Sequence, residues 1–156
     1  MDESIRKGIA YGITSAVITT LGLFIGLSAT QASKNILIGG VLSIAIADAL
    51  SDAMGLHVAE ESTKKHNKIW YQTFAAFATK LLVGLTFIVP ILLFPSHYAV
   101  IIGTLWGIFL MTVLSLYIAF LHNYSYLKTT GMHLLVLLCV IVCTHMVGTF
   151  IGVLLA

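Results

Sequence analysis

The chain has 156 residues, of which 59% are hydrophobic and only 9% are charged, and its mean hydropathy is +1.03. A soluble domain does not carry this proportion of apolar residues, so the composition is that of a polytopic membrane protein. The formal net charge of +2 comes from few and scattered basic residues, which argues against a nucleic-acid partner.

Five apolar segments are each close to the roughly 20 residues that a helix needs to cross a bilayer. They run over residues 8–27, 36–59, 70–94, 98–121 and 134–155. Because short connections join them, we expect a single transmembrane domain over residues 1–156. The predicted fold class is all-α, an integral membrane protein with five transmembrane helices. The sequence offers no nucleophile–base pair and no phosphate-binding loop, so we expect no enzymatic activity.

The basic residues predict the orientation of these helices. Only Lys34 falls on one side of the topology, whereas the other side carries Arg6, Lys7, Lys64, Lys65, Lys68 and Lys128. By the positive-inside rule the N-terminus is cytoplasmic and the C-terminus is outside. Pro90 and Pro95 are expected to kink or end the third helix near the outer face.

Small residues spaced by four recur in the first and the last apolar segments. Gly22 and Gly26 form one such pair, and Gly148 and Gly152 form another. This spacing allows two helices to approach closely. It fits packing within one chain and the seam of a homodimer equally well.

Two aspartates, Asp48 and Asp52, lie in the middle of the second apolar segment. An ionised carboxylate at this depth costs roughly 2.5–3.5 kcal/mol on insertion scales, so such residues usually serve a function. Residues four apart project from one helical face, about 6 Å apart along the axis. Two carboxylates so placed are suited to hold a divalent cation or to pass a proton.

Lys80, in the third segment, is expected at nearly the same depth as Asp48. One interpretation is an architectural Asp48–Lys80 ion pair, which would leave Asp52 unpaired. The other is that Lys80 is a counter-charge that competes with a bound cation for the aspartates.

The last segment carries sulfur and imidazole groups near mid-membrane. Cys139, Cys143 and Met146 share a face, and His145 points elsewhere. Cysteine and methionine are common fillers of apolar helices, whereas a histidine at this depth needs a partner. We take His145 and Met146 as candidate softer metal ligands.

Acidic residues and a histidine gather at the cytoplasmic end of the second segment. His57 and Glu61 share a face, with Glu60 beside them. This group is suited to collect metal ions before entry, although a solvated helix end has the same pattern.

With helix count and orientation in hand, the chain resembles the vacuolar iron transporter family. The threonine-rich segment 11–26, YGITSAVITTLGLFIG, is similar to the family's opening helix. Segment 36–40, ILIGG, and segment 47–51, ADALS, followed by Gly55, are similar to its second helix. Pro90 and the close of the last segment, THMVG at 144–148 followed by Gly152, also fit.

The resemblance implies a five-helix carrier that exports cytosolic iron or manganese in exchange for protons. Asp48 carries over to the family pattern directly. Ser15 stands where the family has an aspartate, Asp52 stands where it has a methionine, and Lys80 has no counterpart there. The glutamate-rich cytoplasmic metal-binding helices of the plant-type members are missing, so the resemblance is to a short, divergent member of the family.

The sequence therefore predicts a homodimeric, multi-pass transporter that exports iron or manganese from the cytosol and is coupled to protons. The metal is the transported substrate, and no other cofactor is expected. We expect the plasma membrane of a prokaryote rather than an organelle membrane. Two alternatives stay open: a proton-coupled carrier of another solute that uses Lys80, and a membrane scaffold that transports nothing.

Overall fold

The computed structural model describes residues 2–63 and 68–154, nearly all of them in helices. Lys64 and Lys65, which contribute to the charge bias above, lie outside the described residues, as does residue 155. The helices are α1 (Glu3–Ala29), α2 (Lys34–Ser62), α3 (Ile69–Thr86), α4 (Ile88–Leu93), α5 (Ser96–His122) and α6 (Tyr126–Leu154).

Five helical stretches are long and apolar enough to cross a membrane, with α3 and α4 together forming the third, Ile69–Leu93. The all-α class and the number of candidate spans are thereby confirmed. Several helices extend beyond the apolar segments, most of all α1, which begins at Glu3 rather than at residue 8, and α6, which begins at Tyr126 rather than at residue 134. Hydropathy marks the apolar part of a helix and not its polar first turns, so Lys128 belongs to α6 and not to a connection.

The third span is interrupted at Phe87, between α3 and α4. Pro90 has no amide hydrogen to donate to the carbonyl of Thr86, four residues earlier, and its ring crowds that carbonyl. The predicted kink is therefore confirmed, one turn before the proline itself. Pro95 immediately precedes the start of α5 at Ser96, which confirms the predicted end of the span.

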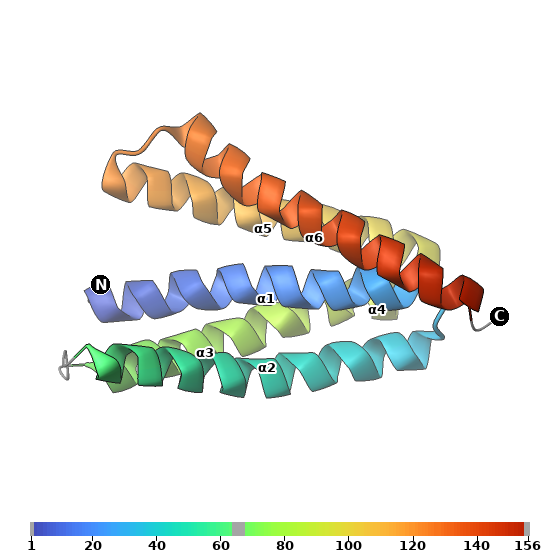
Figure 1. Ribbon diagram of the computed structural model, residues 1–156, viewed down its shortest axis with the longest axis horizontal. Helices are drawn as coiled ribbons and strands as arrows, with labels where there is room; N and C mark the ends of the chain where they lie inside the picture. The colour runs from blue at the N-terminus through green and yellow to red at the C-terminus, as the bar shows by residue number, and fades with distance from the viewer. Residues whose placement is uncertain (1, 64–67, 155–156) are drawn as a thin grey trace.

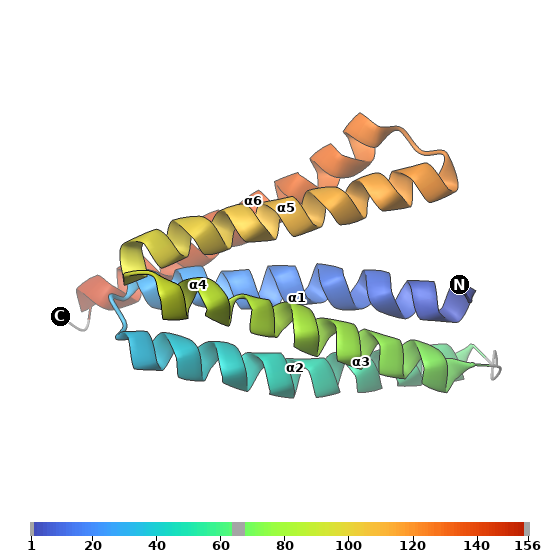
Figure 2. The same ribbon diagram turned by 180° about the vertical axis from the view of Figure 1, so that it is seen from behind.

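Helix α1 lies at the centre of the bundle and packs against α2, α3, α5 and α6. Helices α2 and α3 cover one side of it, and the α5–α6 hairpin lies on the other side (Figures 1 and 2). The hairpin diverges from α1 toward the end of the bundle that holds the N-terminus. The C-terminus lies at the opposite end, as an odd number of crossings requires.

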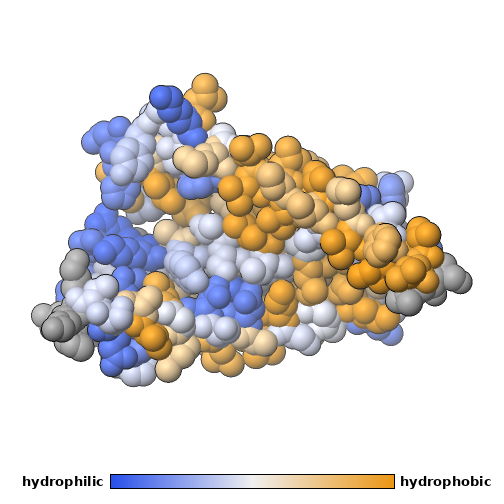
Figure 3. Space-filling model, viewed as in Figure 1, coloured by the Kyte–Doolittle hydropathy of each residue, from blue (hydrophilic) through white to orange (hydrophobic). Residues whose placement is uncertain are grey.

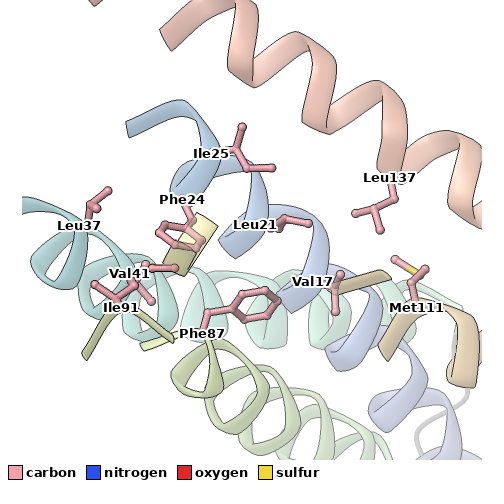
Figure 4. Close-up of a cluster of buried hydrophobic side chains, with 11 residues drawn as sticks. Val17, Leu21, Phe24, Ile25, Leu37, Val41, Phe87, Ile91, Met111 and Leu137 are labelled. Atoms are coloured by element: carbon pink, nitrogen blue, oxygen red, sulfur yellow. The ribbon is translucent and has the colours of Figure 1, made fainter. Parts of the chain in front are cut away.

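The buried core runs along α1 and is completed by one or two side chains from each of α2, α4, α5 and α6 and by Phe87, which joins α3 to α4 (Figure 4). Its members are Val17, Leu21, Phe24, Ile25, Leu37, Val41, Phe87, Ile91, Ala99, Met111 and Leu137. Much of the outer surface is also apolar, whereas hydrophilic residues gather toward the N-terminal end of the bundle (Figure 3). An apolar exterior of this kind is what a lipid environment favours.

Glycines on α1 bring α3 unusually close. A Cβ atom on Gly8 would lie 2.4 Å from the Gln72 carbonyl oxygen, and one on Gly12 would lie 2.8 Å from that of Ala76. Both distances are shorter than a methyl group tolerates. The two backbones therefore pack in direct contact over the N-terminal half of α1.

The small-residue pairs of α1 and α6 pack on each other within the chain. A Cβ atom on Gly148 would lie 2.2 Å from the Gly26 carbonyl oxygen, and one on Gly22 would lie 3.1 Å from Val140. Of the two interpretations of these motifs, the structure shows packing inside one subunit. The homodimer expected from the sequence takes no support from them and stays a prediction.

Replacing Gly148 with alanine should lower the free energy of unfolding by about 1–3 kcal/mol, because α6 must move away from α1. Gly131→Ala, on the same helix, is the matched control, because nothing lies within 4 Å of its added Cβ atom. That variant should be as stable as the wild type or slightly more stable. Unfolding by SDS in mixed micelles measures both, and equal stability of the two variants would contradict the close α1–α6 contact.

Candidate functional site

Lys80 is the most deeply buried charged residue among those that the structure describes, with 2% of its side chain exposed. It lies on the buried face of α3, together with Gln72, Thr73, Ala76 and Gly84. This face has the three-to-four residue spacing of a helix side that packs against neighbours. Because that face meets α1 and α2, the ammonium group of Lys80 is held between three helices.

Two carboxylates from α2 meet this ammonium group. Lys80 Nζ lies 2.6 Å from Asp48 Oδ2 and also pairs with Asp52 Oδ2. The two aspartates are one turn apart on α2, with 25% and 23% of their side chains exposed. The expected Asp48–Lys80 pair is present, but the expectation that it leaves Asp52 unpaired is wrong. Lys80 is long enough to reach both carboxylates because they project from one face.

Ser15 of α1 completes the cluster. Its hydroxyl donates to Asp52 Oδ2, and its Oγ atom accepts a hydrogen bond from Lys80 Nζ at 2.8 Å. The close approach of Gly12 to α3 brings this turn of α1 to the cluster, since a Cβ atom there would lie 3.1 Å from the Lys80 amide. One turn earlier, the side chain of Tyr11 lies close enough to interact electrostatically with Asp52.

Ser15 and Tyr11 are not predicted from the polar pattern of the sequence. Hydroxyl side chains in apolar helices usually bond back to their own helix, as Thr14 and Thr19 do through the carbonyls of Ala10 and Ser15. The family resemblance does single out position 15, because it places Ser15 where that family carries an aspartate.

The two carboxylates are not equivalent. Asp52 receives hydrogen bonds from Ser15 and Lys80 through one oxygen. Asp48 Oδ2 is buried and contacts Lys80, but no hydrogen bond of acceptable alignment reaches it. Asp52 is therefore held by two hydrogen-bond donors, whereas Asp48 is held by the charge of Lys80.

The cluster lies midway along all three helices. Asp48 is the central residue of α2, and Ser15 and Lys80 are each within one residue of the centre of α1 and of the third span. With all three groups ionised, two carboxylates and one ammonium give the cluster a net charge of −1. A proton on either carboxylate, or exchange of the ammonium for a divalent cation, changes this charge.

The structure does not bring His145 and Met146 to this cluster. Both are exposed on α6, which packs mainly against α1 and α5. His145 instead lines a separate cavity of about 530 Å³ with Ser28, Gln31 and His97. Cys139 and Cys143 are exposed on the same helix and unpaired.

His57 and Glu60, near the C-terminal end of α2, each contact a different side chain of α3. His57 Nδ1 lies 3.0 Å from Thr73 Oγ1, and its ring lies 4.5 Å from that of Trp70. Glu60 accepts a hydrogen bond of 3.2 Å from Gln72, whereas Glu61 is exposed. Because the Thr73 hydroxyl also bonds the Ile69 carbonyl, His57 is held against the first turns of α3 through its Nδ1 atom.

Within residues 2–63 and 68–154, no three His, Cys, Asp or Glu side chains converge as a group able to hold a metal ion. A cation bound at the Lys80 cluster would therefore have the carboxylates of Asp48 and Asp52 and the hydroxyl of Ser15 as its ligands. Comparison of the chain with protein-family models, with curated proteins and with solved structures found no match.

Replacing Lys80 with methionine should lower the free energy of unfolding by about 3–5 kcal/mol, because two carboxylates lose their shared counter-charge. Adding Asp48→Leu to Lys80→Met should recover most of that loss by removing one of the unpaired carboxylates. Lys68→Met is the matched control, because its ion pair with Asp2 is exposed to solvent and its loss should leave the stability close to that of the wild type. Equal losses in Lys80→Met and Lys68→Met would contradict the buried cluster.

Proposed function

We propose that the chain is a five-span membrane carrier that exports a divalent cation, iron(II) or manganese, in exchange for protons. Arg6 and Lys7 lie in the first turns of α1, Lys68 directly precedes α3, and Lys128 lies in the first turn of α6. These three helix ends lie at the end of the bundle that holds the N-terminus (Figure 1). Lys34 lies at the other end, where its Nζ donates to the Leu92 carbonyl at 2.9 Å. This distribution supports a cytoplasmic N-terminus and an outer C-terminus.

The observation that carries the proposal is Lys80 bridging Asp48 and Asp52 at the centre of three apolar helices. Ionisable residues at this depth are costly and commonly mark ion or proton pathways. The ammonium group occupies the place between two carboxylates that a metal cation would take. It therefore acts as a built-in counter-charge for the empty carrier.

The coupling of metal transport to protons follows from the charge balance of the Lys80 cluster. In the proposed empty state, the two carboxylates share one proton and Lys80 is charged, so the cluster is neutral. A divalent cation that binds both carboxylates displaces that shared proton, and Lys80 releases a second proton and moves aside. The loaded cluster is again neutral, so two protons are exchanged for one divalent cation without a net change in buried charge.

The donor set favours harder cations. Two carboxylates and a hydroxyl provide only oxygen ligands, which suit manganese better than softer metals such as copper(I). The resemblance to the vacuolar iron transporter family supports iron or manganese as the substrate. His145 and Met146 would act only outside this cluster, and His57, Glu60 and Glu61 line the end of α2 from which a cytosolic ion would approach.

A membrane scaffold that transports nothing is the second candidate. It is favoured by the completeness of the ion pairing, since Lys80 is almost fully buried and contacts both aspartates. In that case the cluster only fixes the packing of α1, α2 and α3. A carrier of another solute gains less support, because an anion would have to displace two carboxylates from Lys80.

The decisive experiment is metal flux into proteoliposomes that contain a divalent-sensitive dye. We expect flux of manganese or iron(II) that follows an imposed pH gradient and is reduced at least tenfold in Asp48→Asn and Asp52→Asn. Asp2→Asn is the charge-matched control, because Asp2 lies outside the cluster and pairs with Lys68, and its flux should equal that of the wild type.

Two results would contradict the carrier. Flux that persists in both cluster variants would remove the aspartates from the pathway. No flux of any divalent ion from folded wild-type protein, together with a stable Lys80→Met, Asp48→Leu variant, would instead establish the scaffold.

A further inference from the structure

A cleft separates α1 from α5 at the end of the bundle that holds the N-terminus. It encloses about 220 Å³ and is lined by four residues of α1, Arg6, Ile9, Ala10 and Ile13, and four of α5, Leu110, Val113, Leu114 and Tyr117. The α5–α6 hairpin diverges from α1 on this side (Figures 1 and 2). The cleft is apolar along its length and has one cationic group.

Arg6 is that group, and it has no acidic partner among the described residues. Its Nε atom is buried and makes no hydrogen bond there. The neighbouring cations are already paired: Lys7 Nζ lies 3.1 Å from Glu3, and Lys68 pairs with Asp2. The Lys68 ammonium, with the Ser4 amide, holds the pKa of the Asp2 carboxyl below its ordinary value of 3.8.

A buried, unpaired donor of a guanidinium group is unfavourable unless something outside the chain satisfies it. A phosphate group is the natural partner, because a guanidinium group binds it through paired hydrogen bonds. Arg6 also lies at the end that the charge distribution assigns to the cytoplasmic face, where anionic lipids are concentrated.

We propose that this cleft binds one anionic phospholipid, with its phosphate on Arg6 and an acyl chain along Ile9, Ile13 and Leu110. The apolar walls are the reason to infer a lipid rather than a free phosphate, since a soluble anion gains nothing from them. Part of one acyl chain would occupy the cleft, and the rest of the lipid would lie in the surrounding bilayer. The inference requires that the chain lies in a membrane, but it does not require cation transport.

Native mass spectrometry of the full chain in detergent micelles tests this site. Phosphatidylglycerol should bind more tightly than phosphatidylcholine, and Arg6→Gln should raise its apparent Kd about five-fold, as expected for one interfacial cation. Lys7→Gln is the matched control, because Lys7 is adjacent but already paired with Glu3, and its Kd should stay within two-fold of the wild type. Ala10→Phe, which fills the cleft and keeps the charge, should also weaken binding.

Equal losses in Arg6→Gln and Lys7→Gln would overturn the site in favour of diffuse surface charge. Unchanged affinity in Arg6→Gln or in Ala10→Phe would overturn it as well. Displacement of the lipid by an equal concentration of inorganic phosphate would show a free-anion site instead. Thermal unfolding of each variant without added lipid verifies that it is folded, and none of these readouts depends on metal flux.

Discussion

The ammonium group of Lys80 joins three helices of this bundle at their midpoints. It contacts Asp48 and Asp52 of α2 and Ser15 of α1, and it is itself held on the buried face of α3. A charge at this position is tolerated only because opposite charges and a hydroxyl surround it. The relative placement of α1, α2 and α3 along their axes is therefore coupled to the charge state of one cluster.

Close backbone packing makes this contact possible. Gly8 and Gly12 let α1 approach α3 until only glycine fits, which brings Ser15 within hydrogen-bond distance of Lys80. On the opposite side of the bundle, Gly26 and Gly148 bring α6 against α1 in the same way. Helix α1 thus lies at the centre of the bundle and contacts four other helices. The α5–α6 hairpin diverges from α1 at the end that holds the N-terminus (Figures 1 and 2).

Much of this arrangement is predictable from the sequence, and the physical reasons are specific. Long apolar runs identify the five candidate spans, and Pro90 identifies the kink, because both depend on local chemistry. The meeting of Asp48 with Lys80 follows from counting residues from each end of two antiparallel helices. The start of α6 at Tyr126 is not predicted, because the helix has polar first turns that hydropathy does not mark.

The remaining features depend on packing between helices, which the sequence does not specify. Helix α6 is apolar around most of its circumference, so the outward direction of His145 and Met146 has no signature in the residue pattern. Ser15 resembles Thr14 and Thr19 in sequence, and only its position opposite Asp52 distinguishes it. The double pairing of Lys80 likewise depends on which face of α3 turns toward α2.

The most direct test of this account is anomalous X-ray scattering from crystals of the protein grown with saturating manganese. The account predicts an anomalous peak between the Asp48 and Asp52 carboxylates, with Lys80 Nζ moved out of the position that it holds in the empty cluster. Lys80 still bridging both aspartates, with no peak between them, would contradict the claim that its ammonium group stands in for a transported cation.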